Sequence, residues 1–206
     1  MRNIFIDKSL ELSDWVISEF EKIQVTVNGR SELAIACFYV TWQHQAAITR
    51  LCEVGLFAPA QALLRCAWES WVRGMWLYEV ATPEQLLSFK QGGDPPNHQQ
   101  LLEGIESKQG LEPGLMLSLH KLQFRTLCDF THTGISQLVS QFSDGAMQAR
   151  LSDDEIRILL LRANTLALAA LGQTALTKNN QTIAESAHKK MHVIDSEFSA
   201  NGEVKK

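Results

Sequence analysis

Residues 59–81 read PAQALLRCAWESWVRGMWLYEVA, and this stretch decides the fold class. Large apolar residues occur on nearly every face of the helix that it predicts, and a helix that is apolar all round is normally buried inside a bundle. A line of charge nevertheless follows the same helix, because Arg65, Glu69 and Arg73 recur at every fourth position. Charged side chains are seldom buried without partners, so we expect this charged stripe to need a polar partner elsewhere in the chain.

The segment before this helix predicts an antiparallel partner for it. Residues 31–54 are mostly apolar at helical spacing, with Ser31 placed to cap the helix and Gly55 placed to stop it. Only a short link ending at Pro59 separates the two segments, and Pro is well suited to a first helical turn. Because short links join antiparallel neighbours, we expect the helices at 31–54 and 59–81 to form the central pair of a bundle.

The rest of the chain also predicts helices, each bounded by a local signal. Thr82 and Ser152 each open a capping box, and Gly and Pro residues mark loops near 91–97 and 110–114. The further helices are expected at 8–22, about 82–90, 97–108, 115 to about 130, 135–142, 152 to about 177, and 181–198, with an extended connector at 23–30 and a loop at 143–150. The predicted fold class is therefore all-α: a helical bundle of about five main helices plus short connecting helices. We expect one domain over residues 1–206, with its core at about 8–198 and a frayed tail at 199–206.

The composition is that of an ordinary globular chain. Its 206 residues, 45% apolar and 20% charged, suffice for one core, and a net charge of −4 gives no general attraction to nucleic acid or anionic membranes. We find no signal peptide and no run of about 18 uncharged apolar residues, so no membrane partner is expected. The four cysteines lie in apolar surroundings without CxxC spacing, which predicts buried free thiols and a cytoplasmic, reducing location.

One group of residues has the chemistry for phosphodiester cleavage. Arg125, Asp129 and His132 are four and three residues apart, so a helix places them on one face. Arg125 offers a fork of donors for a phosphate, His132 can exchange a proton near neutral pH, and Asp129 could orient the imidazole or pair with Arg125. The structural alternative is that His132 bonds backbone where a helix ends and that Arg125 and Asp129 form an ordinary ion pair.

Two other patterns have alternative interpretations. The charged stripe is either a polar pocket facing Arg125 and His132 or a structural ladder of ion pairs covered by tryptophans. His188 and His192 have the spacing to share a metal, although a solvated basic face is the simpler interpretation because no third ligand is placed. Dinucleotide, P-loop, nucleophile-elbow and paired Glu-x-x-His motifs do not occur, so we expect no cofactor and no metal.

A family resemblance rests on two of these stretches. The run from Ala60 to Glu69, with its AxxLxR…E pattern, and the later run from Arg125 to Gly134, with its Phe-Thr-His-Thr-Gly element, resemble uncharacterised bacterial helical families that look related to the HEPN superfamily. The resemblance covers about residues 31–175. HEPN ribonucleases carry Arg and His separated by four to six residues, and Arg125 and His132 have six between them. The chain departs from the pattern at Thr126, where HEPN nucleases often have Asn, Asp or His.

The resemblance implies a function as well as a fold. It implies a helical bundle that forms a homodimer and acts as a metal-independent ribonuclease in a bacterial toxin or phage-defence system, with RNA as substrate and a cognate antitoxin or defence protein as partner. Arg125 and His132 would be catalytic, with Asp129, Glu69, Arg65 and Arg73 in support. The alternative is a non-catalytic HEPN-like helical module that binds a small ligand or a partner protein.

Overall fold

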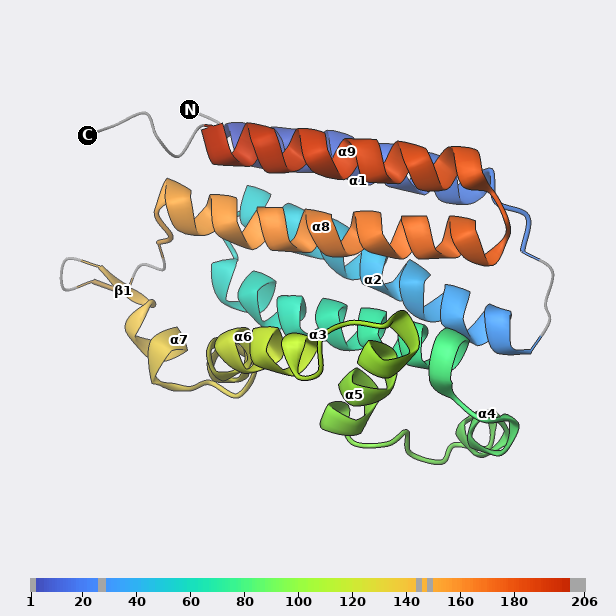
Figure 1. Ribbon diagram of the computed structural model, residues 1–206. Coiled ribbons are helices and arrows are strands. Elements are labelled where there is room, and N and C mark those ends of the chain that lie inside the picture. Colours follow the sequence, from blue (N-terminus) through green and yellow to red (C-terminus); the bar gives the residue numbers. More distant parts are fainter. Residues whose placement is uncertain (1–2, 26–28, 144–145, 148–149, 201–206) are drawn as a thin grey trace.

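The all-α prediction is confirmed by a computed structural model of the chain (Figure 1). The structure describes residues 3–25, 29–143, 146–147 and 150–200, without the side chains of residues 119, 122–127, 136, 143 and 200. The described part contains ten helices and one minimal hairpin: α1 (Ile4–Glu21), α2 (Arg30–Glu53), α3 (Phe57–Met75), the π-helix η1 (Trp76–Val80), α4 (Pro83–Lys90), α5 (His98–Gln109), α6 (Leu115–Thr131), α7 (Ile135–Val139), β1 (Phe142–Ser143), β2 (Ala146–Met147), α8 (Asp153–Thr177) and α9 (Gln181–Ala200).

The helices are arranged around α8, which contacts α1, α2, α3 and α9. The predicted central pair is present, since α2 and α3 pack along each other in opposite directions (Figure 1). α5 and α6 cover the other side of α3, and α4 lies at the edge of the molecule beyond η1 (Figure 1). α8 is also the one helix of the described residues that is long and apolar enough to cross a membrane. Its place at the centre of the bundle, with a largely buried apolar face, is that of a core helix.

Two hydrophobic cores hold the bundle together. The larger one joins α1, α2, α3, α8 and α9, and includes a contact between the rings of Phe5 and Phe198 with centroids 5.0 Å apart. The second joins α2, α3, η1 and α5 around Phe38 and Trp76. Because α2 and α3 contribute to both cores, the layer that carries α5 and α6 is fixed to the rest of the bundle.

A buried polar network fixes how α1, α2 and α8 align. The side-chain amide of Gln45 donates to Asn164 Oδ1 at 2.9 Å and to Thr49 Oγ1 at 3.2 Å, and Asn164 Nδ2 donates to Ser9 Oγ at 2.9 Å. All four residues are buried, so any shift along a helix axis would leave polar atoms without partners.

The closest approach of α2 to α3 depends on a glycine. A Cβ added at Gly74 would lie 2.6 Å from Cε1 of Phe38, whose ring is fully buried. We therefore expect Gly74→Ala to lower the free energy of unfolding by about 1–3 kcal/mol, through overpacking. Gly172 in α8 is the matched control, because its nearest neighbour would be 3.9 Å away; Gly172→Ala should be neutral or stabilising by up to about 1 kcal/mol. Urea denaturation of both variants checks this, and equal effects would contradict it.

Helix α3 ends in a π-helical turn that an arginine from α2 stabilises. Arg30 donates to the carbonyl oxygens of Leu77 at 3.3 Å, Tyr78 at 3.2 Å and Ala81 at 2.5 Å. These carbonyls lie at the end of η1, where backbone acceptors lack helical donors. Arg30 is the first residue of α2, so this contact fixes where α2 begins relative to the end of η1.

A buried glutamate determines where α6 begins. The carboxylate of Glu106, which is only 3% exposed, accepts from the backbone N–H groups of Gly114 at 2.9 Å, Met116 at 2.6 Å and Leu117 at 3.2 Å. The first N–H groups of a helix have no partner inside the helix, and a negative charge there also favours the helix dipole. Glu106 of α5 thus caps α6 from a neighbouring helix.

Several predicted boundaries need correction. Ser31 does not cap α2, because Gly29, with φ of 74°, is the cap residue and the helix begins at Arg30. α1 begins at Ile4 rather than residue 8, since the side chain of Asn3 accepts from Phe5 N. The helix predicted at 135–142 ends at Val139. Of the expected loop at 143–150, residues 143, 146 and 147 take part in a two-strand antiparallel pairing with Phe142, whereas residues 144–145 and 148–149 lie outside the described residues. The capping boxes at Thr82 and Ser152 are confirmed.

The C-terminal helix and the cysteines differ in part from what the sequence predicts. α9 continues to Ala200, so residues 199–200 are helical, whereas the remainder of the expected tail lies outside the described residues. All four cysteines are free thiols, but only Cys52 is buried, and burial raises its pKa to about 12. The other three lie half-buried on the α2 and α3 surfaces and on α6.

Candidate functional site

The charged stripe of α3 meets the end of α6 at Arg65. Arg65 Nη1 lies 2.9 Å from Nε2 of His132 and donates to Cys128 Sγ at 3.4 Å, while its Nε donates to Glu69 Oε1 at 2.7 Å. A guanidinium has no acceptor atom, so Nε2 of His132 must be the acceptor and its imidazole proton must be on Nδ1. The expected contact between the stripe and the His132 end of α6 is therefore present.

Glu69 stabilises the charge of Arg65 at this position. Burial disfavours the charge, but the hydrogen bond and negative charge of Glu69, with smaller contributions from Cys128 and Cys66, raise the pKa of Arg65 above its ordinary value. The side chain of Arg65 is 20% exposed and that of Glu69 is 33% exposed, so both are reachable from solvent. His132 is exposed. The three residues therefore form a cation, a carboxylate and an imidazole at the molecular surface.

Two more histidines extend this polar site along α3. Trp68 Nε1 donates to His98 Nε2 at 3.1 Å, and the rings of His98 and His120 lie 4.3 Å apart. Burial lowers the pKa of His120 to about 4, with His98 and Arg65 acting in the same direction and Glu69 opposing them. Burial likewise lowers the pKa of His98. Both imidazoles are thus uncharged at neutral pH, although twelve helical residues, or about 18 Å, separate His120 from His132.

The pKa of His120 predicts a pH dependence of stability. An unfolded His titrates near 6.5, so as the pH falls from about 6.5 to 4 the unfolded chain binds a proton that folded His120 does not, and stability falls. We expect His120→Gln to flatten the decline of Tm over this range. His192→Gln, at an exposed His of α9, should keep the wild-type slope. Thermal unfolding from pH 4 to pH 7 measures both, and an unchanged slope in His120→Gln would refute the prediction.

Arg73, the last member of the stripe, does not continue the ion pair. Within the described residues it forms no salt bridge, and its Nε is buried without a hydrogen-bond partner. Its charge acts on neighbours instead, because it lowers the pKa of His98 and opposes the burial that raises the pKa of Cys37. The stripe therefore contains one ion pair, Arg65 and Glu69. Arg73 follows without an ion pair, and its charge makes the potential near His98 more positive.

The turn after α6 holds His132 at the surface. His132 is the C-terminal cap residue of α6, Thr133 follows with φ of 56°, and Gly134 N donates to Asp129 O at 2.7 Å. A β-branched residue in the left-handed region is strained, and such strain gathers at functional sites. A Cβ at Gly134 would collide with the carboxylate of Asp129, so glycine is needed where this side chain folds over the turn.

The predicted site residues are thus only partly brought together. Arg65 and His132 are in contact, Glu69 holds Arg65, and Asp129 lies at the turn beside His132. The side chain of Arg125 lies outside the described part of the chain, although its backbone belongs to α6.

His98 and His120 were not predicted to have a role. The only sequence signal was that His120 precedes Arg125 by about one helical turn, and their contact with Trp68 depends on how α5 packs against α3 and α6.

No metal-binding group is found among the residues that the structure describes. Within them, no three His, Cys, Asp or Glu side chains are arranged to hold an ion. His188 and His192 bond each other, with 3.1 Å between their Nε2 atoms, on the exposed face of α9.

Comparison with known proteins assigns the chain to a family. Residues 38–200 match the model of DUF6988, a family of unknown function, and the chain belongs to this family. The match runs from the middle of α2 to the end of α9 and so includes every residue of the polar site. No curated protein and no solved structure matches the chain.

Proposed function

We propose that the chain is a HEPN-like, metal-independent ribonuclease whose reacting centre is built on Arg65 and His132. The observation that carries the proposal is the 2.9 Å contact between Arg65 Nη1 and Nε2 of the exposed His132. An arginine beside a neutral imidazole supplies both needs of RNA transesterification, a cation for the phosphate and a proton acceptor for the 2′-hydroxyl. Arg125, on the same helix as His132, is proposed as a second phosphate-binding cation.

In this proposal the resting contact is exchanged for substrate contacts. A phosphate dianion or diester competes well for Arg65, because a guanidinium binds phosphate oxygens more strongly than a neutral imidazole. Once Arg65 turns to the phosphate, Nε2 of His132 is released. It accepts the proton of the 2′-hydroxyl while the 2′-oxygen attacks phosphorus. The bond to the 5′-oxygen breaks and that oxygen takes a proton from water. The hydroxide left behind takes the proton from His132, which restores the neutral imidazole, and the products are a 2′,3′-cyclic phosphate and a 5′-hydroxyl.

The surrounding groups have supporting parts in the proposal. Glu69 keeps Arg65 charged and oriented, since it accepts from Nε and leaves the Nη atoms to meet the substrate. Arg73 and the uncharged His98 and His120 extend a path of donors and neutral imidazoles along α3, over which the next nucleotides of a single strand could lie. We propose a homodimer in a toxin or phage-defence system, with an antitoxin or defence protein as partner, on the HEPN resemblance alone.

A second candidate function has its own supporting observation. Arg65 contacts Glu69 and His132 at the same time. These contacts could serve only to fix the end of α6 against α3. The chain would then be a non-catalytic helical module that binds a small ligand or a partner protein. Under this alternative, the wild-type chain does not cleave RNA, and replacement of His132 changes only the stability of the fold.

Incubation of the purified chain with a short single-stranded RNA in excess EDTA tests the proposed function. The matched substrate is the same sequence carrying 2′-deoxyribose throughout. We expect the RNA to be cut and the deoxy strand to stay intact, because the proposed nucleophile is the 2′-hydroxyl. An RNA that stays intact with folded protein, or a deoxy strand that is cut equally, would contradict the proposal.

A further inference from the structure

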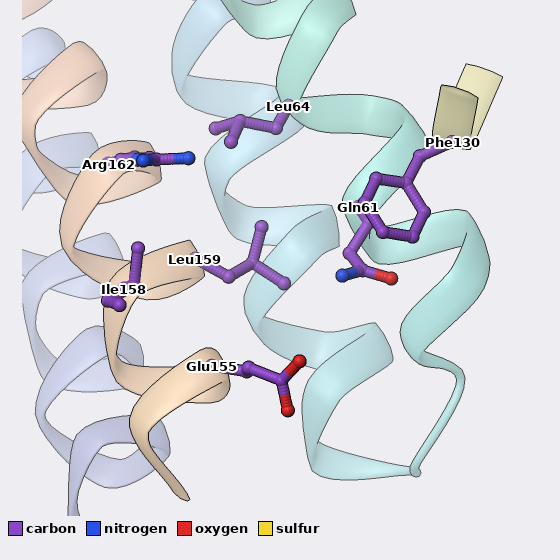
Figure 2. Close-up of a pocket in the computed structure, with 7 residues that line it drawn as sticks. All are labelled: Gln61, Leu64, Phe130, Glu155, Ile158, Leu159 and Arg162. Atoms are coloured by element: carbon purple, nitrogen blue, oxygen red, sulfur yellow. The ribbon is translucent and has the colours of Figure 1, made fainter. Parts of the chain in front are cut away.

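The seam between α3 and α8 contains two adjoining cavities that the proposed ribonuclease chemistry does not use. The first has a volume of ≈ 230 Å³ and is drawn in Figure 2. The second has a volume of ≈ 290 Å³ and shares Leu64 and Arg162 with the first. Each volume lies just below the lower end of the range of about 300–1,000 Å³ that is typical of small-molecule sites, so the ligand would be small.

The walls of the first cavity are mostly apolar. Leu64 of α3, Leu159 and Ile158 of α8, and the ring of Phe130 from α6 face the hollow (Figure 2). At roughly 30 Å³ for each water molecule, a space of ≈ 230 Å³ has room for about eight waters, or for an apolar body of similar size. Removing such a body from water is favourable, by about 25 cal/mol for each Å² of apolar surface that the cavity covers.

Arg162 gives the cavity a charge preference. Its side chain extends from α8 toward α3 (Figure 2), and Arg162 lines both cavities. Within the described residues Arg162 makes no salt bridge and no side-chain hydrogen bond, unlike Arg157 one turn earlier, which is bonded to Asp154 and to Phe198 O. An arginine that lacks a protein partner beside an apolar hollow favours an anionic group on a ligand.

The two carboxylates that line the cavities do not cancel this preference in the first cavity. Glu155 keeps its charge, but it precedes Arg162 by seven residues, or about 10 Å along α8, and it is held at the start of the helix, where it accepts from Ser152 N and Oγ, both at 2.8 Å. Asp195 of α9 lines only the second cavity, so an anion bound at Arg162 avoids it by directing its apolar part into the first.

Gln61 adds a polar requirement at the wall of the first cavity. Its Oε1 is buried and has no hydrogen-bond partner within the described residues. An ordered water or a hydroxyl group of a ligand would satisfy this atom, and a hydroxyl does so whichever way the amide is turned, whereas an ionised carboxylate, which has no donor, leaves it to water.

We propose that the α3–α8 cavity binds a small amphipathic carboxylate, with its anionic group at Arg162 and its apolar body between Leu64, Leu159 and Phe130. The site goes beyond the proposed ribonuclease function and does not depend on it. It backs onto the polar site, because Leu64 directly precedes Arg65 and Phe130 lies two residues before His132.

Titration of the full chain with octanoate, followed by calorimetry and by the side-chain amide resonances of Gln61, tests the proposal. Octan-1-ol and octyltrimethylammonium are the neutral and cationic comparisons. We expect saturable binding of octanoate with a shift of the Gln61 amide, and binding at least about tenfold weaker for either comparison compound.

Arg162→Gln is the decisive variant, because Arg162 is exposed and its loss should not disturb folding. It should weaken octanoate binding at least about tenfold. Arg50→Gln, at an arginine of α2 that lines neither cavity, should leave binding unchanged. The proposal is overturned if octanoate does not bind at millimolar concentration, if Arg162→Gln binds it as well as wild type, or if octan-1-ol binds equally well. These readouts are binding only, so they are independent of whether the chain cuts RNA.

Discussion

His132→Ala is expected to lower the rate of RNA cleavage by about 10²–10⁴-fold, the range by which a positioned acid–base group accelerates proton transfer. The variant removes the imidazole whose Nε2 faces Arg65 and keeps the helix, since His132 is exposed and its backbone N–H bonds Cys128 O independently of the side chain. Single-turnover cleavage in EDTA, with circular dichroism to show that the variant is folded, measures the effect.

The matched control is His192→Ala. His192 is an exposed histidine of α9 whose ring contacts that of His188. The His192→Ala variant should cleave RNA at the wild-type rate. If His132→Ala retains activity within a few-fold of wild type, His132 does not take the proton. If both variants lose activity equally, the loss does not come from a defined site.

Glu106→Ala is expected to lower the free energy of unfolding by about 2–4 kcal/mol, because three N–H groups at the start of α6 lose a charged acceptor in a buried place. Glu106→Gln should cost less, since its amide oxygen still accepts but no longer interacts as a charge with the helix dipole. Urea unfolding at neutral pH measures both.

Glu103 provides the comparison on the same helix. It is exposed and accepts a hydrogen bond from Gln99 at 2.7 Å, so Glu103→Ala should change stability by no more than about 0.5 kcal/mol. A Glu106→Ala variant as stable as Glu103→Ala would show that Glu106 does not anchor α6. Because α6 carries His132, we also expect Glu106→Ala to weaken RNA cleavage at temperatures where the bundle as a whole remains folded.

The helices were predictable where the signals that form them are local. The capping boxes at Thr82 and Ser152, the left-handed stop at Gly110 and the short link before Pro59 all act within a few residues, and each has the predicted effect. The start of α2 was not predictable in this way. Ser31 has the right chemistry for a cap, but Arg30 bonds carbonyls at the end of η1, about fifty residues further along the chain, and the cap is Gly29, two residues earlier.

The candidate site shows the same division between local and tertiary information. The spacing of Arg65 and Glu69 predicted their ion pair, because helical neighbours four residues apart meet without help from the rest of the fold. His98 and His120 could not be assigned, since they reach Trp68 only through the packing of α5 and α6 on α3. Arg162 has no sequence motif at all, and its relation to the cavity depends on the spacing between α3 and α8.

We infer that Arg65 and His132 form a centre that cleaves RNA through its 2′-hydroxyl. Mass spectrometry of the RNA ends, after incubation with wild-type protein in excess EDTA, tests this most directly. We expect fragments that end in a 2′,3′-cyclic phosphate and begin with a 5′-hydroxyl, and we expect none when His132 is replaced by Ala. Intact RNA in the presence of folded wild-type protein, or fragments that carry a 5′-phosphate, would contradict it.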